Sequence, residues 1–195
     1  MAATEPQAAP GNEGRARVSV RALVLLGVVA AGILALDQLA KYLIVANLEL
    51  GEVVPVLGEL LQFHFVKNSG AAFSLASGFT WILSIVAVGV IVAIIVFARR
   101  IKSTAWAWML GLLLGGALGN VTDRLFREPS FGMGHVIDFL QIWGFPAIFN
   151  IADVAICTAM GLFLLLTLRG VHLDGTKASE TIERITPPSA PSTGE

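Results

Sequence analysis

Three aspartates, Asp123, Asp138 and Asp153, lie in short polar clusters of a chain in which only 14% of the residues are charged. The clusters stand around the third and fourth of four long apolar runs. A carboxylate at membrane depth costs roughly 2.5–3.5 kcal/mol on insertion scales, so a chain that holds several near one membrane face is expected to use them. Two carboxylates brought together separate their pKa values, which lets one accept a proton while the other donates. The sequence therefore favours hydrolysis by a membrane-embedded pair of aspartates.

The composition is that of a protein that crosses a bilayer several times. The chain has 195 residues, of which 55% are hydrophobic, and its mean hydropathy is +0.77. These values are typical of polytopic membrane proteins. A helix needs about 20 residues to span a bilayer, and four apolar runs approach that length: 21–46, 79–98, 104–121 and 146–168. We expect an all-α membrane fold with four transmembrane helices.

Arginine and lysine are distributed unevenly between the two ends of these runs. Nine of the thirteen basic residues fall on one side, namely Arg15, Arg17, Arg21, Arg99, Arg100, Lys102, Arg169, Lys177 and Arg184. Cytoplasmic loops carry such an excess, so both termini are expected in the cytoplasm and the aspartates near the outer face. The membrane domain is expected at 15–170. Residues 1–14 and 171–195, rich in Pro, Ala, Ser, Gly and Glu, are expected to be disordered tails.

Two segments on the predicted outer side are too long to be simple turns. Apolar and polar residues alternate over 61–66, as in a half-exposed strand, and turn residues flank this segment. A small extracytoplasmic β-sheet is therefore expected there. The segment 125–145 holds several glycines and aromatic residues. It predicts an interfacial loop or helix with its rings at the level of the lipid headgroups.

Asp37 and Lys41 are four residues apart in the first run, so they share one face of a helix and can form an ion pair. Such a pair would help the span to tolerate its charges. The alternative is that Lys41 orients an outer loop. The sequence favours the structural role.

Asn120, Asp123 and Arg124 end the third run. One interpretation makes Asp123 and Arg124 a helix-terminal ion network and nothing more. In the other, Asn120 reaches a carboxylate or a substrate amide, and Arg124 holds a backbone carbonyl or a lipid phosphate ester. The preceding glycines, Gly115, Gly116 and Gly119, predict the close approach of another helix.

Asn150 and Asp153 begin the fourth run and have a purely structural interpretation. Asn150 would cap the helix, and Asp153 would interact with the helix dipole in the first turn. Asp138, however, lies in the apolar stretch 136–140 on the same outer face. An unpaired carboxylate there would be costly, and Asp153 gives it a partner.

Other chemistries have little support in the sequence. His64 and His135 have no second histidine or cysteine at metal-ligand spacing, and Cys157 and Ser69 have no convincing base. We therefore expect neither a metal nor another cofactor, and neither a serine nor a cysteine mechanism. The net charge of −1 gives no indication of a nucleic-acid partner.

Five short blocks together resemble the lipoprotein signal peptidase (signal peptidase II) family. They are DQLAK (37–41), NSGAAF (68–73), GGALGNVTDR (115–124), HVIDF (135–139) and FNIAD (149–153). Their order and spacing match those of the family across about residues 20–170. The resemblance implies an aspartyl endopeptidase of the bacterial cytoplasmic membrane. Its substrates would be prolipoproteins whose lipobox cysteine already carries diacylglycerol, cut before that cysteine.

The resemblance also implies a role for each site residue. The catalytic pair falls on Asp138 and Asp153, whereas Asp37 and Lys41 match structural positions. The positions that support the site or line the substrate pocket are Asn68, Gly70, Asn120, Asp123, Arg124 and Asn150. A monomer in contact with membrane lipid is expected.

A small proton-coupled transporter is the alternative from another functional class, because intramembrane carboxylates often serve as proton relays. Such proteins usually place the carboxylate in the middle of a span. Here the carboxylates gather towards one face of the membrane, which favours chemistry at the surface over passage across it.

Overall fold

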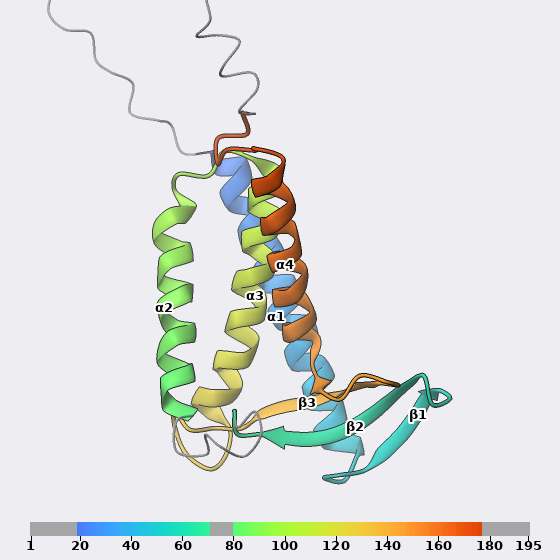
Figure 1. Ribbon diagram of the computed structural model, residues 1–195. Coiled ribbons are helices and arrows are strands. Elements are labelled where there is room, and N and C mark those ends of the chain that lie inside the picture. Colours follow the sequence, from blue (N-terminus) through green and yellow to red (C-terminus); the bar gives the residue numbers. More distant parts are fainter. Residues whose placement is uncertain (1–18, 71–79, 177–195) are drawn as a thin grey trace, which may run out of the picture.

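The computed structural model describes residues 19–70 and 80–176 (Figure 1). In this part of the chain a bundle is formed by four helices: α1 (Val20–Asn47), α2 (Thr80–Ala98), α3 (Thr104–Phe126) and α4 (Ile151–Leu168). All four are long and apolar enough to cross a membrane. The four predicted spans are therefore present as helices, although α3 continues to Phe126 instead of ending at 121, and α4 begins at Ile151 instead of 146.

Glycines on α3 set its distance from two neighbouring helices. A Cβ atom at Gly115 would lie 2.7 Å from the carbonyl oxygen of Ala30 on α1, and one at Gly116 would lie 2.6 Å from that of Ala152 on α4. A side chain at either position would force the helices apart. The close helix approach predicted from these glycines is thus present, and it brings polar groups of α1, α3 and α4 within reach of one another.

A four-stranded antiparallel sheet lies at one end of the bundle (Figure 1). Its strands are β1 (Val53–Leu57), β2 (Leu61–Asn68), β3 (Val136–Ile142) and β4 (Ile148–Phe149), arranged in that order. The strand predicted at 61–66 is confirmed as β2. Val66 lies opposite Asp138 and Asn68 lies opposite Val136. Asn68 and Asp138 are therefore diagonal neighbours on one face of the sheet.

The all-α description needs correction, because part of the segment 125–145 is a strand and not an interfacial loop or helix. β3 occupies Val136–Ile142 in the middle of that segment. Its residues are mainly β-branched, aromatic or aliphatic, which suits a strand buried between neighbours. β2 supplies the pairing edge from a distant part of the chain. As a result, Asp138 sits on a strand and not at the end of a span.

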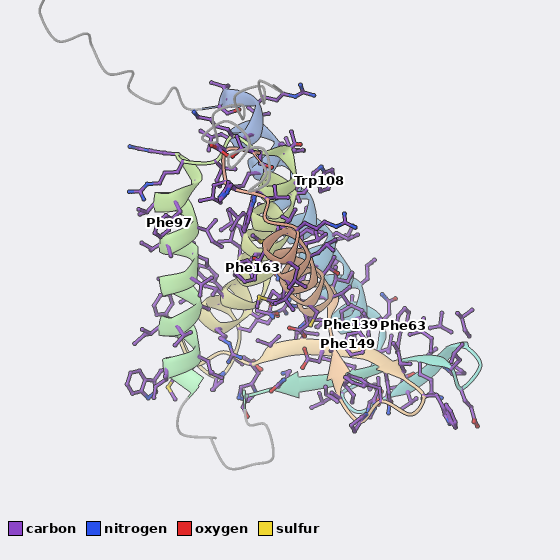
Figure 2. The ribbon with its side chains drawn as sticks, turned by 45° about the horizontal axis from the view of Figure 1, so that its top comes forward. Phe63, Phe97, Trp108, Phe139, Phe149 and Phe163 are labelled. Carbon is purple, nitrogen blue, oxygen red and sulfur yellow. The ribbon has the colours of Figure 1, made fainter. Side chains whose placement is uncertain are left out.

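An apolar cluster joins the sheet to the bundle. Its buried members are Ile44, Phe65, Ile137 and Phe139. The rings of Phe63 and Phe139 meet edge to face with centroids 6.0 Å apart, and Figure 2 shows both on the sheet, close to where it meets the helices. Successive side chains of a strand point to opposite faces. Burial of Phe139 in this cluster therefore turns Asp138 towards the other side of β3.

The helix ends nearest the two termini lie at the end of the bundle opposite the sheet (Figure 1). Residues 171–176, which the sequence assigns to the C-terminal tail, form a turn held to the α2–α3 link. The backbone N–H groups of Lys102 and Ser103 donate to the carbonyl oxygen of Leu173 at 3.0 and 3.1 Å. The predicted N-terminal tail and the rest of the C-terminal tail lie outside the described residues.

Candidate active site

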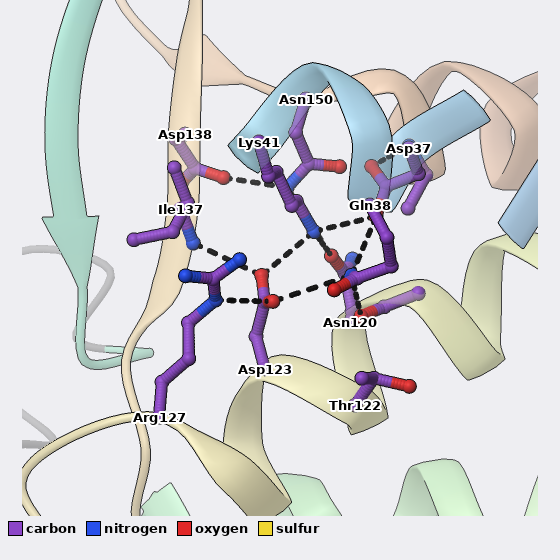
Figure 3. Close-up of polar contacts among 12 residues, drawn as sticks. Asp37, Gln38, Lys41, Asn120, Thr122, Asp123, Arg127, Ile137, Asp138 and Asn150 are labelled. Carbon is purple, nitrogen blue, oxygen red and sulfur yellow. Dashed lines mark hydrogen bonds and ion pairs between the residues drawn. The ribbon is translucent and has the colours of Figure 1, made fainter. Parts of the chain in front are cut away.

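Polar side chains from α1, α3, β3 and α4 converge where the sheet meets the bundle (Figure 3). The most buried of them, Asp37, Lys41, Asp123, Asp138 and Asn150, are between 0% and 2% exposed. A buried charge is costly unless it is paired and hydrogen-bonded. The role of each buried polar group therefore depends on the residues with which it pairs. The groups divide into an ion cluster around Lys41 and a pair of carboxylates beside it.

The ion cluster consists of Asp37, Lys41, Asp123 and Arg127. Lys41 Nζ lies 2.8 Å from Asp37 Oδ2 and 2.8 Å from Asp123 Oδ2. Asp123 Oδ1 accepts a hydrogen bond of 2.6 Å from Arg127 Nε. Two cations thus balance two carboxylates, which is the arrangement that makes their burial tolerable.

Both carboxylates of the ion cluster also hold the backbone of neighbouring elements. The N–H of Ala152 donates to Asp37 Oδ1 at 2.9 Å, and that of Ile137 donates to Asp123 Oδ2 at 3.2 Å. Asp37 therefore fixes the first turn of α4, and Asp123 fixes β3 one residue before Asp138. The ion pair predicted between Asp37 and Lys41 is confirmed. The alternative ion network of Asp123 with Arg124 is not formed, because Asp123 pairs with Lys41 and Arg127.

Asn150 connects the two carboxylates that come from β3 and α4. Its Nδ2 donates to Asp138 Oδ1 at 2.6 Å, and its backbone N–H donates to Asp153 Oδ2 at 3.2 Å. Asn150 Oδ1 in turn accepts from the backbone N–H of Asp153 at 3.0 Å. The last two bonds form a capping box at the start of α4. The predicted helix cap is therefore present, and it is also what places Asp153 beside Asp138.

Two more asparagines complete the surroundings of the carboxylates. Asn68 Nδ2 donates to Asp138 Oδ2 at 2.7 Å, and Asn120 Nδ2 donates to Asp153 Oδ1 at 2.8 Å. Burial raises the pKa of Asp138 to about 6; the hydrogen bond from Asn68 opposes this rise, and the charge of Asp153 adds to it. Asp138 thus holds a proton at a pH where an ordinary aspartate has lost it.

A cavity of about 550 Å³ opens beside the carboxylate pair. Asp138, Asp153 and Asn68 line it, and most of the remaining lining side chains are apolar, among them Phe149 and Val154. A concave apolar site with a few converging polar groups is the usual form of a ligand site. The arrangement can bind an apolar ligand and present two carboxylates to a polar bond within it.

Arg124 lies next to this site without joining the ion cluster. Its Nη1 atom is buried and has no hydrogen-bond partner in the described part of the chain. Gly70, with φ of +84°, approaches so closely that a Cβ atom there would lie 3.2 Å from Nη1. A buried donor without a partner costs roughly 1–3 kcal/mol. The guanidinium is therefore suited to an acceptor on a bound molecule. Residues 71–73, which complete the predicted block around Gly70, lie outside the described residues.

The structure brings all ten predicted site residues into this one region, together with two that were not predicted. Gln38 Nε2 donates to the carbonyl oxygen of Gly119 at 3.1 Å and to Asp123 Oδ1 at 3.3 Å. Gln38 lies inside the block 37–41, and this position is the sequence feature that could have identified it as a site residue. Arg127 lies four residues after Asp123, and this spacing on a helix could have identified the pair.

Comparison with known proteins gives a family match. A family model described as Signal peptidase (SPase) II matches residues 29–169. The chain is 63% identical over 166 residues to the lipoprotein signal peptidase of Leifsonia xyli subsp. xyli (strain CTCB07), covering 85% of this chain and 77% of that protein. It is 47% identical over 154 residues to that of Rhodococcus jostii (strain RHA1), covering 79% and 77% respectively.

The fold also matches a solved structure described as a bacterial membrane enzyme, determined by the in meso method at 1.9 Å resolution. The TM-score is 0.67 at 26% sequence identity, and the match covers 80% of this chain and 99% of the other. The four helices and the small sheet thus recur in a membrane enzyme.

Proposed function

Because this chain belongs to the signal peptidase II family, we propose that Asp138 and Asp153 are the residues with which it hydrolyses its substrates. The protein is a multi-pass bacterial membrane peptidase that removes signal peptides from prolipoproteins. The observation that carries the proposed mechanism is the bridging of the two carboxylates by Asn150 at the wall of an apolar cavity. The test is cleavage of a purified prolipoprotein by the purified protein.

The two aspartates divide the proton transfers of the reaction. The ionised carboxylate takes a proton from a water molecule held between the pair, and the protonated partner donates to the scissile carbonyl and later to the leaving amine. Burial, which raises the pKa of Asp138, keeps a proton on the pair.

We propose that the substrate is the precursor whose lipobox cysteine already carries diacylglycerol, and that the cut falls before this cysteine. Arg124 and Asn68 are the candidates for holding the substrate backbone, with Gly70 leaving room beside the guanidinium. Asn120, Asp123 and Asn150 support the pair through the hydrogen bonds described above. We also propose that the protein acts as a monomer, because the described residues of one chain supply both carboxylates and their hydrogen-bond partners.

The first prediction concerns pH. We expect kcat/KM to fall roughly tenfold per pH unit above the pKa of the protonated carboxylate, since the reaction needs that proton. Asp138, with a pKa of about 6, places the start of this fall near that pH in the free enzyme. The measurement is kcat/KM against pH with a fluorogenic lipopeptide in one detergent.

Asn68→Ala sharpens this test. The hydrogen bond from Asn68 lowers the pKa of Asp138, so its removal should move the alkaline fall to higher pH even if the maximum rate drops. A flat profile between pH 6 and pH 9, or a fall at the same pH in both proteins, would contradict the assignment of Asp138 as part of the proton-sharing pair.

The second prediction concerns orientation. We propose that both termini are cytoplasmic and that the sheet and the site lie at the outer face. Arg21, Arg99, Arg100, Lys102 and Arg169 stand at or next to the helix ends that lie away from the sheet, and such an excess of basic residues is typical of the cytoplasmic side. In a Cys157→Ala background, Glu59→Cys and Ser130→Cys should react with an impermeant thiol reagent added outside the cell. Lys102→Cys, at the other end, is the matched control and should react only after permeabilisation. The reverse pattern would place the site inside.

A further inference from the structure

Lys41 is connected to Asp153 of the carboxylate pair through a single asparagine, Asn120. Figure 3 shows Lys41 and Asn120. Lys41 Nζ lies 3.1 Å from Asn120 Oδ1, and Asn120 Nδ2 lies 2.8 Å from Asp153 Oδ1. An ammonium, an amide and a carboxylate therefore form a continuous chain of hydrogen bonds from α1 through α3 to α4. Lys41 is completely buried, so bulk water does not reach the ammonium at the α1 end of these hydrogen bonds.

The chemistry of the ammonium allows Asn120 only one orientation. An ammonium donates and never accepts, so the amide oxygen of Asn120 must face it. Asn150 Nδ2 donates to the same oxygen at 3.2 Å. With two donors on its oxygen, the amide turns its NH₂ group towards Asp153. The reverse orientation would set N–H against the ammonium and the amide oxygen against the carboxylate.

We propose that Lys41 is a positioning residue for the reaction: it fixes the amide of Asn120, and that amide holds the carboxylate of Asp153. The proposal rests on the proposed role of Asp153. Asp153 Oδ1 then accepts from Asn120 and Oδ2 from the backbone of Asn150, so the plane of the carboxylate is fixed relative to Asp138. Lys41 thus does more than balance the charges of Asp37 and Asp123.

The experiment separates positioning from charge balance. Removal of Lys41 alone would leave two buried carboxylates with one cation and risks unfolding. The double variant Asp37→Asn with Lys41→Met removes one charge of each sign and leaves Asp123 paired with Arg127, so the ion cluster stays neutral. We expect this variant to keep a cooperative thermal unfolding transition and to lose ~10- to 10²-fold in kcat, because misplacing a catalytic group by about 1 Å costs that much. KM should change little.

A double-mutant cycle tests whether the effect passes through Asn120. If it does, adding the charge-balanced pair of changes to Asn120→Ala should lower kcat by less than ~2-fold beyond Asn120→Ala alone, since interacting residues are not additive. Fully additive losses would overturn the proposal, as would wild-type kcat in the folded double variant.

A second variant covers the case in which the double variant does not fold. Asn120→Asp keeps an oxygen for Lys41 but has no N–H to donate to Asp153. It should lose kcat to a similar extent, and wild-type kcat in this variant would overturn the proposal.

Asp153→Asn distinguishes a failure of the proposed mechanism from a failure of the proposed role of Lys41. Normal turnover by Asp153→Asn would contradict the proposed mechanism itself. Additive losses of kcat in the double-mutant cycle would contradict only the role of Lys41.

Discussion

Replacing either Asp138 or Asp153 with asparagine should abolish cleavage while the protein remains folded in the membrane. Each substitution removes a group that must gain or lose a proton, and loss of such a group costs at least ~10²–10⁴-fold in rate. Asparagine has nearly the same shape, and its single oxygen can keep one of the two side-chain or backbone donors that each carboxylate accepts. The measurement is turnover of a diacylglyceryl-prolipoprotein by each purified variant, together with its thermal unfolding.

Asp174→Asn is the matched control for these substitutions. Asp174 is an exposed aspartate in the turn at the opposite end of the bundle, where it accepts hydrogen bonds from Thr176. Its replacement should leave turnover unchanged. Near-normal turnover by Asp138→Asn or Asp153→Asn would show that the residue concerned is not a member of the pair.

A precursor that lacks diacylglycerol should be cut at least ~10²-fold less efficiently than the lipidated form, an effect of the size expected when a reacting bond is misplaced by about 1 Å. Each buried CH₂ of an acyl chain contributes roughly 0.8 kcal/mol to membrane anchoring. The acyl chains would hold the scissile bond at the depth of the carboxylates, beside the largely apolar cavity that Asp138 and Asp153 line. The measurement is kcat/KM for the two forms of one precursor.

The comparison needs both precursors in the same micelles. Each retains its own apolar signal helix, so partition into detergent should be equal and can be checked by co-sedimentation. A difference in kcat/KM then reports the lipid at the cleavage site. Equal values for the two forms would show that lipid anchoring does not position the substrate, and the proposal that the substrate must be diacylated would fail.

Much of this site could be predicted from the sequence because its polar residues are spaced three or four apart. Asp37 with Lys41, and Asn150 with Asp153, share helix faces wherever those helices lie in space. The long apolar runs identified the helices for a similar reason, since length and composition alone specify a membrane span.

The pairing of β3 with β2 and the bond from Lys41 to Asn120 could not be predicted. β3 is a short apolar stretch whose pairing partner, β2, lies about 70 residues earlier, as the bond from Asn68 to Asp138 illustrates. Such a stretch fits a strand or a buried helix equally well until the partner is known. The bond from Lys41 to Asn120 spans a similar separation. Only the packing of α1 on α3 through glycines made it possible.

The helix cap at Asn150 restricts the residue types that can occupy that position. At an ordinary helix start, serine, aspartate and asparagine serve almost equally well. Here the same side chain caps α4 with its oxygen and donates from its nitrogen to Asp138 and Asn120. Serine is too short to serve both ends, and aspartate would add a third negative charge where two are already crowded. A substitution that most helices would absorb would therefore inactivate this enzyme without unwinding it.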